Sequence, residues 1–176
     1  MQRSEVGCLP CTNSCVTVPQ DKYIAAEYFG SFYNLYSPGL ACVGFDCMGM
    51  CISLRSITSR VEQLVVTVPT KTQDSVFVEV CVAVQFSVNP EGAKDAFYKL
   101  SDVGAQIDSY VSDTVRSQIP RLTLDEAFES KDQTSAAVQE DLAKHMANYG
   151  FQIHKALVTE VAVSDEVMRS MNEINK

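Results

Sequence analysis

The chain has 176 residues, the size of one domain that can bury a core of its own. Its 22 acidic and 14 basic residues give a net charge of −8, so it lacks the basic stripe with which proteins neutralise nucleic-acid phosphates. The same negative charge excludes recruitment to anionic lipid by charge alone. We therefore expect no nucleic-acid partner, and any membrane attachment has to be apolar.

The first fifteen residues combine three cysteines with a proline and small polar residues, which predicts a flexible or tethered tail over 1–15. The start leads into no apolar segment, so we expect no secretory signal. Gln2 stands where N-myristoylation requires Gly. No stretch reaches the roughly 20 apolar residues of a membrane-spanning helix. Without export, the seven cysteines are expected to be reduced thiols in a cytosol-facing protein.

The segment that follows is rich in aromatic and aliphatic residues. Residues 23–35 predict a pair of strands bent at Gly30, and Pro38-Gly39 predicts a turn. Residues 40–52 carry one charge and show neither helical nor strand periodicity, and Gly44 and Gly49 disfavour a helix. We therefore interpret 40–54 as an apolar loop.

In the central segment, apolar residues occupy every second position, which is the period of a β-strand with one buried face. The alternating positions are Val76, Val78, Val80, Val82, Val84, Phe86 and Val88. Residues 61–68 are also rich in Val and Leu, and 72–75 supply a turn, so the sequence predicts a long antiparallel hairpin. Cys81 falls on the opposite face of this strand, and we interpret it as a packing residue.

Helices are predicted next, the first of them capped by Asn89 with Pro90 in its first turn. Thr123 with Glu126, and Ser130 with Gln133, match capping boxes, and Gly150 suits a helix end. The apolar faces are Ala93, Ala96, Phe97 and Leu100, then Ile107, Tyr110, Val111 and Val115, then Val138, Leu142, Met146 and Tyr149.

A closing strand is predicted from Phe151, Ile153, Leu157, Val161 and Val163, with interruptions at Lys155 and Thr159. Residues 165–176 predict the start of a C-terminal helix, which we expect to continue in a longer protein. The order of strands, helices, strand and helix indicates an α+β fold.

Many short segments in register resemble one known family. They are Phe29-Gly30-Ser31-Phe32, Pro38-Gly39, residues 70–78, 95–101, 115–117, Ile119-Pro120, 122–125, Phe128-Glu129 and 171–175. Together they are similar to the SPFH (band 7, or stomatin-prohibitin-flotillin) domain of the hypersensitive-induced reaction proteins, over roughly residues 16–176. The resemblance implies an SPFH domain at 16–164, a curved antiparallel sheet with helices packed on it, whose 40–54 loop faces a membrane.

The resemblance also implies a function. Family members are membrane-associated scaffolds that form large homo-oligomers, as rings or cages, which organise membrane microdomains and recruit or restrain membrane partners. Members commonly begin Met-Gly and then Cys, whereas this chain has Gln2 and its first cysteine is Cys8. Three alternatives stay open: an accessory or regulatory subunit of a membrane protease or other large membrane complex, a structural component of a larger organelle assembly, and a cysteine-based metal binder.

Two groups of cysteines are candidates for S-acylation, because several acyl chains would anchor an acidic protein without positive charge. They are Cys8, Cys11, Cys15, Cys42, Cys47 and Cys51. The expected membrane-contact residues beside them are Leu40, Val43, Phe45, Met48, Met50, Ile52 and Arg55.

Other interpretations of the same residues remain. The spacing Cys8-x-x-Cys11 resembles half of a zinc site, although no standard second half follows. A redox C-x-x-C normally opens a helix in a βαβ unit, and no such pattern surrounds Cys8. The cysteines are otherwise plain free thiols. Arg55 and Arg60 could contact lipid phosphates, or could simply be solvated.

Catalytic signatures are missing from the sequence. His145 and His154 have no nucleophile–base pattern around them, and there is no G-x-S-x-G, P-loop or H-E-x-x-H motif. We therefore expect no enzymatic activity and no cofactor. The candidate subunit contacts are Val76, Val78, Arg116, Asp125, Glu126 and Glu129, where the carboxylates could instead form a solvated face favoured by a helix N-terminus.

Overall fold

The computed structural model describes residues 15–44 and 51–163. The chain divides into two compact units. Of the described residues, the first unit comprises 15–44, 51–61, 87–101 and 148–151, and the second comprises 62–86, 102–147 and 152–163. None of the helices in the described residues is long and apolar enough to cross a bilayer.

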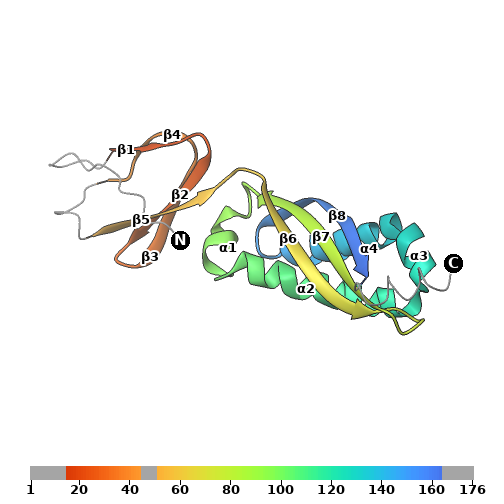
Figure 1. Ribbon diagram of the computed structural model, residues 1–176. Helices are drawn as coiled ribbons and strands as arrows, with labels where there is room; N and C mark the ends of the chain where they lie inside the picture. The colour runs from red at the N-terminus through yellow and green to blue at the C-terminus, as the bar shows by residue number, and fades with distance from the viewer. Residues whose placement is uncertain (1–14, 45–50, 164–176) are drawn as a thin grey trace. The chain divides into compact units, whose positions relative to one another are not determined.

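The first unit is built from short antiparallel strands (Figure 1). These are β1 (Cys15–Val18), β2 (Lys22–Tyr28), β3 (Ser31–Tyr36), β4 (Gly39–Cys42) and β5 (Ile52–Thr58). They form a two-stranded sheet, β1–β4, and a three-stranded sheet in the order β3–β2–β5. The core comprises Val16, Val18, Ile24, Ala26, Ala41 and Val43, with Tyr36, Ile52 and Leu54 packed against it. The predicted strand pair bent at Gly30 is confirmed as β2 and β3.

The predicted loop over 40–54 is wrong at both of its ends, since residues 40–42 lie in β4 and residues 52–54 in β5. In β4, Ala41 is buried while Leu40 and Cys42 are exposed. Only three residues of the strand therefore alternate, and this is too short for period 2 to be recognised in the sequence. Residues 45–50 lie outside the described part of the chain.

The first unit also contains α1 (Ala93–Tyr98), which begins later than predicted. Gly92, not Asn89, is its N-cap, because the backbone of 89–92 forms a turn in which Gly92 N–H donates to the Asn89 carbonyl at 3.1 Å. The Asn89 side chain accepts from the Glu91 N–H within this turn. Of the predicted apolar face, Ala93, Ala96 and Phe97 are buried, and Leu100 is half-buried.

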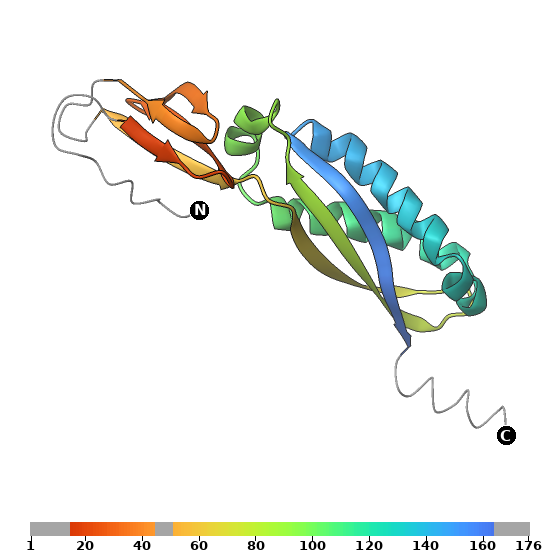
Figure 2. The same ribbon diagram turned by 90° about the horizontal axis from the view of Figure 1, so that it is seen from above.

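The second unit pairs a three-stranded sheet with helices. It holds β6 (Glu62–Lys71) and most of β7 (Phe77–Val88) and β8 (Phe151–Val163), in the order β6–β7–β8. Strands β6 and β7 form the predicted antiparallel hairpin, and β8 runs antiparallel to β7 (Figure 2). The central position of β7 explains its alternation, since Val78, Val80, Val82, Val84 and Phe86 are all buried.

The described part of the second unit also contains four helical segments. They are α2 (Val103–Gln118), the 3₁₀ turn η1 (Ile119–Arg121), α3 (Leu124–Glu129) and α4 (Lys131–Ala147). The predicted apolar positions Ile107, Val111 and Val115 of α2, and Val138, Leu142 and Met146 of α4, are buried. Helices α2 and α4 cover one face of the sheet (Figure 2).

The two predicted capping boxes differ in outcome. The box at Thr123 is present, with Glu126 N–H donating to Thr123 Oγ1 and Thr123 N–H donating to the Glu126 carboxylate. The box at Ser130 does not form. Ser130 is the C-cap of α3 with φ −90° and ψ 18°, whereas an N-cap needs extended backbone, and its buried hydroxyl has no hydrogen-bond partner among the described atoms.

Strand β8 changes face midway. Ile153 is buried, His154 and Lys155 are both exposed, and Ala156 is then buried in place of the predicted Leu157. Helix α4 reaches the backbone of this strand, where Ser135 Oγ accepts from Val158 N–H at 2.9 Å. The Ser135 hydroxyl thus pairs with the Val158 N–H, a backbone donor that a neighbouring strand would otherwise pair with. The predicted C-terminal helix lies outside the described residues.

Candidate membrane-contact site

The turn between β2 and β3 presents an aromatic side chain at its tip. Tyr28 pairs with Ser31, so Phe29 and Gly30 form a two-residue loop, and both have positive φ, 48° and 78°. Positive φ at both positions is the type I′ geometry that favours Asn-Gly. A non-glycine residue in this conformation costs about 1–2 kcal/mol. Phe29 is nevertheless 74% exposed, so neither turn preference nor packing explains its presence.

Other aromatic side chains surround this tip. The Tyr28 ring meets the Phe29 ring edge-on at 4.8 Å, and Tyr33 is also exposed. The Phe29 N–H donates to the Cys51 carbonyl at 3.0 Å, which ties the turn to the chain entering β5. A pocket of about 270 Å³ adjoins the tip and is lined by Ala26, Glu27, Tyr28, Tyr33, Val43, Gly44 and Ile52. The turn, the end of β4 and the start of β5 thus share one end of the first unit.

Two of the predicted thiols lie side by side. Cys15 pairs directly with Cys42 across β1 and β4, and their sulfur atoms are 2.8 Å apart. The hydrogen bond with Cys42, then burial, then the charge of Cys42 as a thiolate raise the pKa of Cys15 above its ordinary value. Both cysteines are exposed, on the same face of the sheet as Leu40. Cys51 is partly buried, and Cys8, Cys11 and Cys47 lie outside the described residues.

The predicted membrane-contact residues separate into surface and core. Leu40 is 75% exposed and available for contact. Val43 is buried in the core of the first unit, and Ile52 packs against that core, so both serve the fold. Phe45, Met48 and Met50 fall in the segment that is not described. Sequence reasoning missed Phe29, whose signal is a bulky aromatic directly before Gly in a two-residue turn.

Arg55 is held by an internal ion pair. Its Nε lies 2.9 Å from the carboxylate of Glu27, which is 4% exposed. Tyr98 from α1 donates its hydroxyl to the same carboxylate at 2.8 Å. Partial burial and the bond to Glu27 raise the pKa of Tyr98 to about 12. Contact of Arg55 with lipid phosphate would compete with this pair, and Arg60 is likewise paired, with Asp21 at 3.1 Å.

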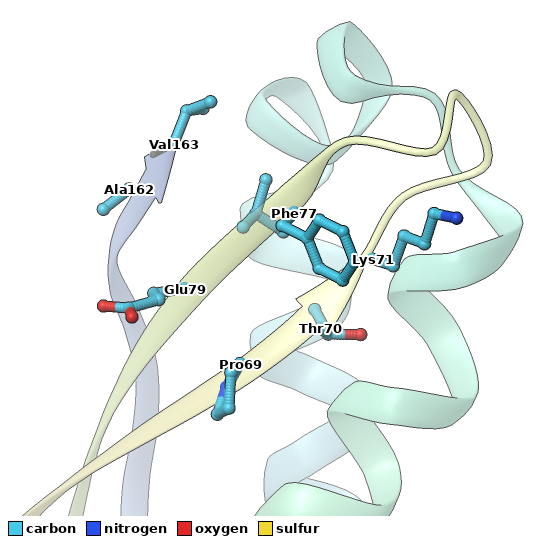
Figure 3. Close-up of a pocket in the computed structure, with 8 residues that line it drawn as sticks. Pro69, Thr70, Lys71, Phe77, Glu79, Ala162 and Val163 are labelled. Carbon is cyan, nitrogen blue, oxygen red and sulfur yellow. The ribbon is translucent and has the colours of Figure 1, made fainter. Parts of the chain in front are cut away.

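A groove of about 500 Å³ lies on the second unit at the end of the β6–β7 hairpin (Figure 3). Phe77 lies in it, 67% exposed, with the Lys71 ammonium 5.6 Å from its ring centroid. Glu79 adds the opposite charge (Figure 3). The lining residues are Pro69, Thr70, Lys71, Phe77, Val78, Glu79, Ala162 and Val163.

The predicted subunit contacts lie in different surroundings. Val78 is 2% exposed, so its side chain offers no surface, and Val76 precedes β7 in the turn. Of the two strands of the predicted hairpin, β7 is paired on both sides, whereas β6 is the outer strand of the sheet in the described residues. Arg116, Asp125, Glu126 and Glu129 are exposed. Glu126 has a local role, since hydrogen bonds from the Thr123 backbone and hydroxyl hold its pKa below the ordinary value.

Metal binding has no support in the described residues, where no cluster of three or more His, Cys, Asp or Glu side chains could hold an ion. Cys8 and Cys11, the candidate half-site, precede the described part of the chain.

Comparison with known proteins agrees with the motif resemblance. The family model described as "SPFH domain / Band 7 family" matches residues 16–176. The chain is also similar to "Hypersensitive-induced response protein 4" of Arabidopsis thaliana, with 36% identity over 149 residues. The matched region is 85% of this chain and 50% of the relative, so the chain spans about half the relative's length. The expected family resemblance and α+β fold class are thereby confirmed.

Proposed function

Because this chain belongs to the SPFH (band 7) family of membrane-associated scaffolds, we propose that it attaches to a bilayer through the aromatic and thiol-bearing end of its first unit. Phe29 supports this proposal most strongly. It is a 74% exposed aromatic in a strained turn conformation, in contact with the exposed Tyr28 ring, and Tyr33 and Leu40 of the same unit are exposed as well. Aromatic rings of this kind suit the boundary between lipid and water.

The net charge of −8 makes an apolar contact necessary, because anionic headgroups repel an acidic protein. A few aromatic side chains alone give reversible binding, and stable anchoring takes a second signal such as an acyl chain. Exposed Cys15 and Cys42 are the described candidates for S-acylation, with Cys51 nearby and Cys8, Cys11 and Cys47 as further candidates. Hydroxylamine-dependent exchange of thioester-bound acyl groups on the protein from its own membranes tests this, and a protein with no exchangeable groups contradicts it.

The substitution Phe29→Asn separates membrane contact from folding. Asn-Gly is the favoured type I′ sequence, so the variant keeps or improves the turn while it removes the exposed ring. We expect the share of full-length protein in the membrane fraction to fall several-fold. The control is Phe128→Asn, which removes a 40% exposed phenylalanine from α3 of the second unit. An unchanged share for Phe29→Asn, or an equal loss in both variants, contradicts the proposed contact.

Assembly with copies of itself is the second part of the proposed function. The groove around Phe77 supports it, since it offers an exposed aromatic ring flanked by one basic and one acidic side chain. In this proposal a second copy of the chain covers the groove, and the scaffold acts by organising membrane lipid and partners without catalysis of its own.

The native mass of the protein extracted from its own membranes in mild detergent tests assembly. A large, uniform particle composed mainly of this chain is the expected result. A complex dominated by a protease or other proteins would instead make the chain an accessory subunit. A monomer found in the soluble fraction without detergent would exclude the membrane scaffold altogether.

A further inference from the structure

The Cys15 and Cys42 pair has a geometry that no membrane contact requires. The two residues are directly opposed on antiparallel strands, and their sulfur atoms already lie 2.8 Å apart. Directly opposed residues of an antiparallel pair have Cα atoms about 4.5 or 5.5 Å apart. A disulfide accepts Cα separations of about 4.4–6.8 Å, so either type of pair fits. The sulfurs need to approach by less than about 1 Å to reach the bond length of about 2.05 Å.

We propose that Cys15 and Cys42 form a reversible disulfide by exchange with a small-molecule disulfide such as oxidised glutathione. Both thiols are exposed, so the oxidant reaches either one. The neighbouring side chains on the same face of the two strands are Thr17 and Leu40, neither of which is charged. Formation of the bond does not require membrane attachment, since it involves only these two sulfurs and the oxidant.

The reaction proceeds in two balanced steps. One cysteine, after losing its proton to solvent, attacks a sulfur of the oxidised glutathione, which releases one glutathione thiol and leaves a mixed disulfide. The second cysteine, also deprotonated, attacks the protein sulfur of that mixed disulfide and releases the second glutathione thiol. Two protein thiols are oxidised, and one glutathione disulfide is reduced to two thiols.

The bond would link the first strand of the first unit to β4, with Cys15 and Cys42 27 positions apart in the sequence. In a reducing cytosol the thiols stay free, and disulfides there are usually transient or redox-sensing. The same two sulfurs are also candidates for S-acylation, and a sulfur in a disulfide cannot carry an acyl chain. Oxidation therefore prevents the acylation of both cysteines at once.

Mass spectrometry of tryptic peptides identifies the bond without ambiguity in a suitable variant. Trypsin cuts after Lys22, so Cys15 and Cys42 fall in two different peptides. A disulfide between them would hold these two peptides together. Replacing Cys8, Cys11, Cys47 and Cys51 with Ser leaves one cysteine in each of these peptides. The full chain is equilibrated with oxidised and reduced glutathione, quenched with acid, alkylated and digested.

We expect the linked peptide to become the main form in oxidised glutathione and to disappear after reduction. In the same background, a chain with Cys42→Ser and Cys51 restored should instead carry glutathione on its separate thiols, because Cys51 is not opposed to Cys15. Separate glutathionylation or alkylation of Cys15 and Cys42 under all glutathione ratios would overturn the proposal. So would equal linkage of Cys15 to Cys51. Neither result depends on membrane binding, so failure here leaves the proposed function intact.

Discussion

Single residues show how the first unit holds a buried charge. Glu27 is 4% exposed and would be costly to bury alone, yet it receives the Arg55 guanidinium at 2.9 Å and the Tyr98 hydroxyl at 2.8 Å. The Tyr98 ring also meets Phe32 edge-on at 5.8 Å, and the Lys94 ammonium lies 4.8 Å from the Phe32 centroid. This group joins α1 to β2, β3 and β5, so its role is to keep the first unit together.

Tyr98→Phe tests that role with little change in shape. The ring keeps its contact with Phe32, but Glu27 loses one donor. We expect the free energy of unfolding in urea to fall by about 1–2 kcal/mol, the range for a lost hydrogen bond to a charged group whose site is partly open to water. Tyr33→Phe, which removes an exposed hydroxyl, should change it by less than about 0.5 kcal/mol. Equal effects of the two variants would contradict a special role for Tyr98.

The pH dependence of the same pair follows from the raised pKa of Tyr98. That pKa is about 12 in the folded protein, against an ordinary value of 10.0. Because the folded pKa is the higher one, the stabilisation is complete below pH 10 and is lost as the pH rises toward 12. The difference in unfolding free energy between the natural protein and Tyr98→Phe should therefore shrink over this window. A constant difference from pH 9 to 12 would show that the hydroxyl does not act through its proton.

At the scale of helices and strands, two glycines of the first unit lie against each other, Gly92 at the start of α1 and Gly150 directly before β8. Gly150 has φ +80°, and a Cβ there would lie 2.0 Å from the Gly92 carbonyl oxygen. Asn89 N–H donates to the Gly150 carbonyl at 2.9 Å in the same region. Gly150 thus has two reasons to be glycine: a left-handed backbone and a backbone neighbour that cannot move aside.

Gly150→Ala should therefore be strongly destabilising. The left-handed conformation accounts for about 1–2 kcal/mol, and the clash adds about 1–3 kcal/mol. Gly104→Ala is the matched control, because Gly104 lies in the first turn of α2 and its Cβ would meet only Asp102 Oδ1 at 3.4 Å. The control should be neutral or stabilising by up to about 1 kcal/mol. Urea unfolding of both variants gives the comparison. A small loss of unfolding free energy for Gly150→Ala would contradict both reasons for a glycine at this position.

The cap of α3 supplies a second prediction at this scale. Thr123→Ala removes the oxygen that accepts from Glu126 N–H, and should lower the unfolding free energy by about 1 kcal/mol. Thr123→Ser keeps the hydroxyl oxygen, so its unfolding free energy should fall much less. In the Ala variant the pKa of Glu126 should also rise toward its ordinary value, which NMR titration measures, because one of the two donors that lower it is gone. An unmoved Glu126 pKa would contradict the observed box.

On the scale of the whole molecule, the exposed Phe77 ring tests how copies of the chain meet. Phe77→Ser should shift the native mass in mild detergent toward smaller species if the groove is covered by a second copy. Val65→Ser is the control, since Val65 is 58% exposed on β6 of the same sheet and does not line the groove. Unchanged mass with Phe77→Ser, at an unchanged unfolding free energy, would place the subunit contact elsewhere.

The sequence by itself determined the family, the α+β class, the β6–β7 hairpin and the buried faces of the helices. Those features rest on local periodicity repeated over many residues, as in the alternation from Val78 to Phe86, and on motifs in register. The Thr123 box was equally readable because both partners lie within four residues. The same local pattern failed at Ser130, where the end of α3 imposed a backbone that an N-cap cannot use.

Only the tertiary structure decided how residues distant in sequence meet. It placed Cys15 against Cys42, set Glu27 between Arg55 and Tyr98, put Val43 in the core, and left Phe29 exposed on a strained turn. Each of these contacts depends on strand pairing or on the position of a helix. The residues next to each partner in the chain do not specify such a contact, because it becomes favourable only when the sheets and helices have packed.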